Sequence, residues 1–261
     1  MRAALSWALA LGCVSTPHPA PSRAPVDLCD APIVAPSPAL GLAAFYRKHL
    51  DARGVPVVSS AVASDASLRA ACRIVVRLVG AREDVRARMI AASARVTVMA
   101  RTEVTTDVPE HAFLARDTAT DWDARARGLG GTVTVPTTSC AEENLLCLAG
   151  DRYRGENILV HELAHGVFNL GVDADFRARV EAAFNTARAA GRWERTYAAT
   201  NADEYFAEGT QSYFDTNRES VPPNGIHNEV DTRAELLAYD PALHALVAEV
   251  FPGLDWSPGC P

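Results

Sequence analysis

The segment 157–170, NILVHELAHGVFNL, constrains the fold more than any other part of this chain. Apolar side chains would surround a helix formed by this segment on nearly every side, which is typical of a buried helix. They are Ile158, Leu159, Val160, Leu163, Val167, Phe168 and Leu170. The same segment carries His161, Glu162 and His165, and a buried charge is tolerated only when it is paired or coordinates a metal. The rest of the chain must therefore bring partners or a cation to this helix.

The spacing of these three residues favours a metal ion. His161 and His165 are four residues apart, so a helix places both imidazoles on one face, with Cβ atoms roughly 5–6 Å apart. Glu162 then lies where its carboxylate can contact a metal-bound water, and H-E-x-x-H is the pattern of zinc hydrolases. A solvated face with incidental histidines fits an apolar helix badly. Core histidines satisfied by hydrogen bonds would need partners for three polar groups at once. We expect one Zn²⁺ per chain.

A third ligand is expected downstream, because a catalytic zinc usually has three protein ligands and one open position. The extended pattern with a histidine six residues after His165 is absent, since Gly171 stands there. The segment TNADEYFAEGTQSYF offers Glu204 and Glu208, four residues apart on a predicted helix. We expect Glu204 to ligate the metal and Glu208 to accept the outer N–H of a ligating histidine. A solvated glutamate pair is the alternative. Gly209 costs about 1 kcal/mol against alanine inside a helix, which predicts a close approach to the first helix.

In combination, HELAH and the EYFAE that begins 39 residues after His165 resemble the gluzincin zinc metallopeptidases. The resemblance is strongest to the catalytic domains of anthrax lethal factor and the Pro-Pro endopeptidases. It implies that Glu204 is the third ligand, and that Tyr197, seven residues earlier, assists catalysis. The resemblance covers residues 157–214 and does not extend to the N-terminal half. Glu208 also resembles the aspartate of the thermolysin-type E-x-x-x-D pattern, with Glu in place of Asp.

These motifs assign a role to each side chain. Glu162 is expected to act as general base toward a zinc-activated water, and Tyr197 to donate a hydrogen bond to the oxyanion. A buried structural tyrosine is the alternative for Tyr197, and His227 in NGIHNEV is a rival oxyanion donor. His111 in PEHAF has no metal-like spacing.

We therefore expect a zinc-dependent endopeptidase whose substrate is a peptide or protein. The GGTVTVP segment, 130–136, precedes the metal helix and contains a predicted strand, along which a peptide would add as a further strand; an interior strand is the alternative. A zinc hydrolase of a non-peptide bond and a catalytically silent zinc-binding extracellular domain are alternatives, because fold and metal do not fix the substrate. The sequence gives no indication of oligomeric state.

Hydrophobic periodicity predicts an α+β fold, mostly helical, with a small sheet and the H-E-x-x-H helix buried, as in zincin-like domains. We expect a Pro- and Ala-rich lead-in over 14–40 and one domain over 41–261, with an N-terminal part (41–128) and a metal-site part (129–261). Helices are predicted at 41–54, 65–80, 82–94, from about 156, 173–191, 201–215 and, as one or two helices, 231–251. Strands are predicted at 55–60, 95–100 and 132–136.

The N-terminus and the charge bear on location and partners. Residues 1–13, MRAALSWALALGC, resemble an export signal, because about ten apolar residues are too few to span a bilayer. Cys13 follows Gly12 as in a bacterial lipobox, although Ala10 and Leu11 are swapped, so a lipid anchor at Cys13 is one expectation. A weakly hydrophobic disordered terminus is the alternative. We expect an exported protein, secreted, periplasmic or lipid-anchored. The net charge of −7 without a long basic run argues against nucleic-acid binding.

The remaining cysteines permit two disulfides and one free thiol in an oxidising compartment. Cys140 and Cys147 bracket a short loop and are the first predicted pair, and Cys29 with Cys260 is the second. Cys72 lies on the apolar stripe of a predicted helix and is expected to be a buried thiol. No close C-x-x-C pair exists, which argues against a cysteine zinc site.

Overall fold

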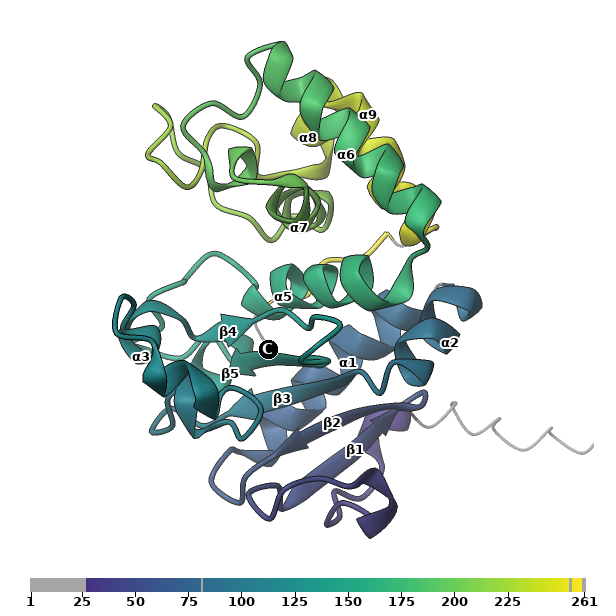
Figure 1. The fold of residues 1–261 in the computed structure, drawn as a ribbon, viewed down its shortest axis with the longest axis vertical. Coiled ribbons are helices and arrows are strands. Elements are labelled where there is room, and N and C mark those ends of the chain that lie inside the picture. Colours follow the sequence, from purple (N-terminus) through teal and green to yellow (C-terminus); the bar gives the residue numbers. More distant parts are fainter. Residues whose placement is uncertain (1–26, 81, 254, 260–261) are drawn as a thin grey trace, which may run out of the picture.

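The computed structural model describes residues 27–80, 82–253 and 255–259 (Figure 1). The predicted signal segment, Cys13 and Cys260 lie outside this part of the chain. The fold is α+β, as predicted, with a mixed five-stranded sheet of order β1-β2-β3-β5-β4. The strands are β1 (Lys48–Ala52), β2 (Val55–Ser59), β3 (Arg95–Met99), β4 (Gly128–Leu129) and β5 (Thr137–Ala141). The central strands β2, β3 and β5 are parallel, and the edge strands β1 and β4 are antiparallel to their neighbours.

Helices flank this sheet and continue beyond it. They are α1 (Asp65–Gly80), α2 (Glu83–Ala91), α3 (Trp122–Arg125), α4 (Glu142–Leu145), α5 (Ile158–Gly166), α6 (Ala174–Ala189), α7 (Ala202–Tyr213), α8 (Arg233–Tyr239) and α9 (Pro241–Val250). Short 3-10 helices occur at Leu28–Asp30, Pro38–Leu40, Thr105–Asp107, Ala112–Arg116 and Tyr197–Ala199, and a π-helical turn at Val167–Gly171. In Figure 1, α5 lies between the sheet and the layer formed by α6 to α9. Within the described ranges, none of the helices is both long and apolar enough to cross a membrane.

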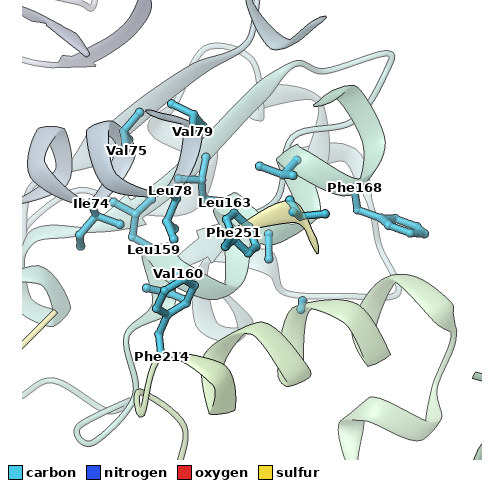
Figure 2. Packing of buried hydrophobic residues seen from close by; sticks show 14 of the residues in the cluster. Ile74, Val75, Leu78, Val79, Leu159, Val160, Leu163, Phe168, Phe214 and Phe251 are labelled. Atoms are coloured by element: carbon cyan, nitrogen blue, oxygen red, sulfur yellow. The ribbon is translucent and has the colours of Figure 1, made fainter. Parts of the chain in front are cut away.

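The two faces of the sheet are covered differently. On one face, alternate strand residues such as Val96, Val98 and Cys140 join the main core, in which apolar side chains of α1 and α5 interlock (Figure 2). On the other face, Met99 and Ala141 form a small apolar cluster with Val108. This alternation follows from the two-residue period of a strand. It leaves α5 buried against the sheet, as its apolar sequence predicts.

The predicted helix over 41–54 is wrong, because its second half is the strand β1. Ala52 pairs with Val55 across a two-residue turn, and Arg53 and Gly54 both have positive φ angles. Turns of this kind match the twist of the flanking strands. Gly54 is therefore a hairpin residue and not the end of a helix. The predicted strand at 55–60 and the next at 95–100 are confirmed, with one residue fewer each.

The predicted strand over 132–136 is also wrong. Thr132 N donates to Val135 O at 2.8 Å, which closes a turn, and Val133 is 78% exposed. Pro136 has no N–H to give to a ladder, and β5 begins directly after it at Thr137. The alternation of Thr and Val resembles a strand, but the edge strand β4 lies just before this turn.

Both predicted disulfides are wrong. Cys29 bonds to Cys72, so Cys72 is on the buried face of α1 as expected but is not a free thiol. Cys140 is free and buried, because its position on β5 directs its side chain into the main core. Cys147 is disulfide-bonded, and not to Cys140. The Cys29–Cys72 bridge fastens the segment before β1 to α1.

Gly209 has the packing role predicted for it, but toward a different helix. A Cβ atom on Gly209 would lie 2.4 Å from Leu243 Cδ2 of α9, and α5 is not the neighbour concerned. Gly209→Ala should lower the free energy of unfolding by about 1–2 kcal/mol, because overpacking outweighs the gain in helix propensity. Urea unfolding measures this change. In a Leu243→Ala background the cost should shrink, because the space is vacated; an equal cost in both backgrounds would contradict the steric explanation.

His111 makes stability depend on pH. Its side chain is 3% exposed, and Nε2 lies 3.2 Å from Ser139 Oγ. Burial lowers the pKa of His111 to about 4, because the opposing effect of the negative charge of Glu110 is smaller and the positive charge of Arg95 lowers the pKa further. Between pH 6.5 and pH 4, His111 is therefore protonated in the unfolded chain but neutral in the folded chain. Stability should therefore be complete above pH 6.5 and fall by about 3 kcal/mol as pH drops to 4. In unfolding titrations His111→Gln should flatten this slope, and an unchanged slope would disprove the assignment.

Candidate metal centre

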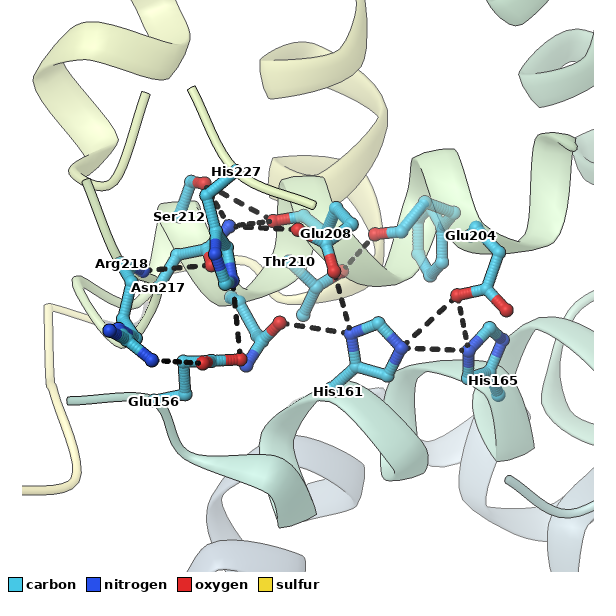
Figure 3. Close-up of polar contacts among 12 residues, drawn as sticks. Glu156, His161, His165, Glu204, Glu208, Thr210, Ser212, Asn217, Arg218 and His227 are labelled. Atoms are coloured by element: carbon cyan, nitrogen blue, oxygen red, sulfur yellow. Dashed lines mark hydrogen bonds and ion pairs between the residues drawn. The ribbon is translucent and has the colours of Figure 1, made fainter. Parts of the chain in front are cut away.

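The three predicted ligands meet at one point. His161 and His165 occupy successive turns of α5, and their Nε2 atoms lie 3.0 Å apart. Glu204, in the first turn of α7, places Oε2 3.2 Å from His161 Nε2 and 3.1 Å from His165 Nε2 (Figure 3). Within the described residues this is a group that could hold a metal ion. Packing of α7 on α5 has thus brought together side chains that are 39 or more residues apart in sequence.

Each histidine is oriented by an acceptor at its other ring nitrogen. His161 Nδ1 lies 2.9 Å from Gln211 Oε1, and His165 Nδ1 lies 2.6 Å from Asp203 Oδ1. The other carboxylate oxygen of Asp203 accepts from Asn169 Nδ2 at 3.1 Å. When Nδ1 donates, the lone pair of Nε2 is free for a cation, and such outer contacts fix the orientation of ligating imidazoles.

Glu208 lies farther from the histidine than predicted. Its Oε1 is 3.4 Å from His161 Nδ1, whereas Gln211 is within hydrogen-bonding distance. Glu208 is buried and accepts from Asn217 Nδ2 at 3.1 Å. Sequence reasoning missed Gln211 and Asp203. The available signals were that Gln211 is seven residues after Glu204, on the same helix face, and that Asp203 directly precedes Glu204.

The donor set suits zinc. Two imidazole nitrogens and one carboxylate oxygen are common zinc ligands at about 2.0–2.2 Å, and tetrahedral coordination at that distance separates the donors by about 3.3–3.5 Å. The three atoms here are 3.0 to 3.2 Å apart, slightly closer than this spacing. The three donor residues also line a cleft of about 470 Å³, which would leave room for a water molecule as the fourth ligand.

The charges of the site support a cation. Burial alone would lower the pKa of His161, but the hydrogen bond with Glu204 and the nearby Glu162 and Glu208 raise it to about 9. Burial alone would raise the pKa of Glu204, but hydrogen bonds with both histidines hold it well below its usual range. The carboxylates therefore attract positive charge to the point where the three donors converge. Burial raises the pKa of Glu162, the direction that suits a general base near neutral pH.

The predicted catalytic side chains Glu162 and Tyr197 line the same cleft. The Tyr197 ring stacks near the His161 imidazole, with centroids 6.5 Å apart and planes inclined by 26°. Its backbone N–H donates to Ile226 O at 2.8 Å, which fixes the short 3-10 helix beside the site. His227 is buried, with Nε2 3.4 Å from Glu156 Oε2, and is absent from the described lining of the cleft.

The edge strand β4 forms a wall of the cleft. Gly128, Leu129 and Gly130 all line it, and β4 is the last strand in the sheet order. A Cβ atom on Gly130 would lie 2.3 Å from the Cβ of His165. The glycines thus allow the strand to lie directly against the metal helix. His111, by contrast, contacts Ser139 on the other face of the sheet.

Removing an outer hydrogen bond should weaken metal binding. Gln211→Ala and Asp203→Ala are each expected to lower zinc affinity about 10–100-fold, since the histidine they orient becomes mobile. Competition with a fluorescent zinc chelator measures the change. Asp203→Asn keeps an acceptor oxygen, so its zinc affinity should fall less than that of Asp203→Ala. Equal losses for the alanine and asparagine variants would show that the hydrogen bond to His165 is not what matters.

Comparisons with known proteins add one distant likeness. A scan against protein families finds no match, and a search of curated proteins finds none. Among solved structures, the chain is similar to the Pro-Pro endopeptidase from Paenibacillus alvei, with 18% sequence identity and a TM-score of 0.45. The match covers 70% of this chain and 91% of that chain. A likeness this distant carries no argument about the site, which stands on its own geometry.

Proposed function

We propose that this protein is a zinc-dependent metallopeptidase that cleaves internal peptide bonds. The observation that carries the proposal is the convergence of His161 Nε2, His165 Nε2 and Glu204 Oε2 within 3.2 Å of one another, beside a cleft that also holds Glu162. The first three residues would hold the ion. When bound, zinc supplies a water of lowered pKa and polarises a substrate carbonyl.

The other side chains would handle protons and charge. Glu162 would accept the proton of the attacking water and return it to the leaving amine. The Tyr197 hydroxyl would donate a hydrogen bond to the oxygen that becomes negative in the transition state. The open edge of β4 would bind the peptide as an added strand, with main-chain hydrogen bonds supplying affinity.

A general base distinguishes this proposal from its alternatives. A zinc domain kept for stability needs the ligands but has no use for Glu162 beside the open side of the site. A zinc hydrolase of another bond would keep the same residues, so the substrate decides between the two enzymes. We propose further that the protein acts outside the cytoplasm, and the Cys29–Cys72 disulfide supports this location.

The test combines metal content with substrate profiling. Protein purified and dialysed against trace zinc should contain one zinc per chain by mass spectrometry, and should cleave members of a random peptide library. A chelator should stop cleavage, and zinc should restore it. A His161→Ala, His165→Ala double variant serves as the inactive control. Absence of zinc, or cleavage of ester substrates alone, would reject the peptidase proposal.

A further inference from the structure

A cationic side chain, that of Arg125, lies in the cleft and forms no ion pair with any residue that the structure describes. Arg125 ends α3 and lines the cleft together with Glu162 and Tyr197. Its guanidinium carbon lies 5.5 Å from the centroid of the Trp122 ring, and the guanidinium also interacts with the Tyr197 hydroxyl. The indole N–H of Trp122 donates to Asp117 at 2.8 Å. Arg125 is therefore held on an anchored aromatic surface beside the expected oxyanion donor.

The three aspartates that precede Arg125 in sequence, at positions 117, 121 and 123, are hydrogen-bonded to other groups. Asp117 accepts from Trp122, Asp121 caps α3 by accepting from Ala124 N, and Asp123 accepts from Thr106. Across the described ranges, no ion pair involves Arg125.

The second arginine of the cleft shows the contrast. Arg127 forms a two-pronged pair with Glu143, at 2.7 and 3.0 Å, and also donates to backbone carbonyls. Four of its five N–H groups therefore donate to acceptors inside the protein. Arg125 lines the same cleft but has no such carboxylate partner among the described residues.

The chemistry of guanidinium determines what would fill this position. Its planar fork matches a carboxylate, and two parallel charged hydrogen bonds are stronger than neutral ones. Five acidic residues line the cleft, namely Glu156, Glu162, Asp203, Glu204 and Glu208. They outnumber the two positive charges of a bound zinc ion, so an anionic substrate group would be attracted to Arg125 rather than to the acidic side of the cleft. Since Tyr197 would contact the scissile carbonyl, the anionic group must lie close to that bond.

We propose that Arg125 binds a carboxylate of the substrate, one or two residues from the scissile bond, so that the protein selects peptides with an anionic group at that position. This inference rests on the proposed function for the position of the scissile bond, but the carboxylate site itself does not. The carboxylate belongs either to an acidic side chain or to a peptide C-terminus. A purely structural alternative is that Arg125 serves only to hold Tyr197.

Binding tests the inference without cleavage. The zinc-loaded Glu162→Gln protein is titrated with octapeptides of neutral residues that carry one Glu, Gln or Lys at each position, an N-terminal neutral dye and a C-terminal amide. At one position the Glu peptide should bind about tenfold more tightly than the Gln peptide. A matching neutral peptide with a free C-terminus shows whether the terminal carboxylate is the preferred source.

Charge reversal then separates recognition from structural support. In the same background, Arg125→Gln should abolish the preference, and Arg125→Glu should turn it toward the Lys peptide. Arg154→Glu is the matched control, because Arg154 is exposed, nearby and outside the described lining of the cleft, and it should leave the preference unchanged. If Arg125 only held Tyr197, both Arg125 substitutions would lower kcat when made in the wild-type protein, and neither would invert the binding preference in the Glu162→Gln background.

The outcomes distinguish this inference from the proposed function. Equal binding of the Glu, Gln and Lys peptides, or an unchanged preference in Arg125→Glu, overturns the carboxylate site. Inversion of the preference establishes it. If the preference inverts but the wild-type protein cleaves none of these peptides, the peptidase proposal fails while the carboxylate site stands.

Discussion

Glu162→Gln should retain one zinc per chain and cleave peptides about 10²–10⁴-fold more slowly than the wild type, the range a positioned general base contributes. Glutamine has nearly the same shape, so the wall of the cleft is preserved, but it cannot accept a proton. The three ligand atoms belong to other side chains, which is why the metal should stay. Zinc content and kcat are measured on the same preparation.

The comparison with a ligand variant makes this result specific. His165→Ala should lose zinc and activity together, whereas Glu162→Gln should lose activity alone. Wild-type kcat in Glu162→Gln would remove Glu162 from the mechanism. It would also favour the view that the site exists for stability.

Tyr197→Phe is expected to lower kcat about 10²–10³-fold, the usual cost of losing one oxyanion donor. The phenylalanine ring can keep the stacking on His161, so the change removes the hydroxyl and little else. KM should change little, because the hydrogen bond forms mainly in the transition state. Steady-state kinetics on a peptide found in the library screen measures both constants.

His227→Gln supplies the counterpart for Tyr197→Phe. His227 is buried against Glu156, so its loss should affect stability more than kcat. Activity is therefore compared per mole of zinc-loaded folded protein. A greater loss of kcat in the His227 variant than in Tyr197→Phe would give the oxyanion role to the histidine.

Local spacing explains why the ligands could be predicted from the sequence. A helix fixes the relative position of His161 and His165 four residues apart, and Glu204 stands in an equally regular pattern on its own helix. The partners of the histidines were harder to predict. Gln211 and Asp203 reach them only because α7 packs on α5 in one orientation, which the sequence of either helix alone does not reveal.

Strand pairing limited the prediction of the fold. Residues 48–52 have no apolar helix face of their own, and they become a strand because β2 offers a register across the Arg53–Gly54 turn. The short strand β4 has only two residues, too few for a pattern to show. The Cys29–Cys72 bridge joins residues 43 apart, a distance in sequence that gives no local signal. In each case the structure of a segment is determined by a contact with residues outside that segment, which a local sequence pattern does not reveal.

Because Gly130 lies so close to His165, the position of the proposed peptide-binding strand cannot change independently of the position of the metal-binding helix. Any side chain at position 130 would displace the backbone of the metal helix or the strand itself, since only a hydrogen fits there. The strand that would carry the peptide and the helix that would carry the ion therefore form one rigid surface. A Cβ atom on Gly128 of β4 would likewise lie 2.7 Å from Ile158 Cγ2 of α5, so changes that accept a bulkier substrate would have to leave both glycines in place. Variation in specificity is therefore directed toward α3 and the loop around Ile226.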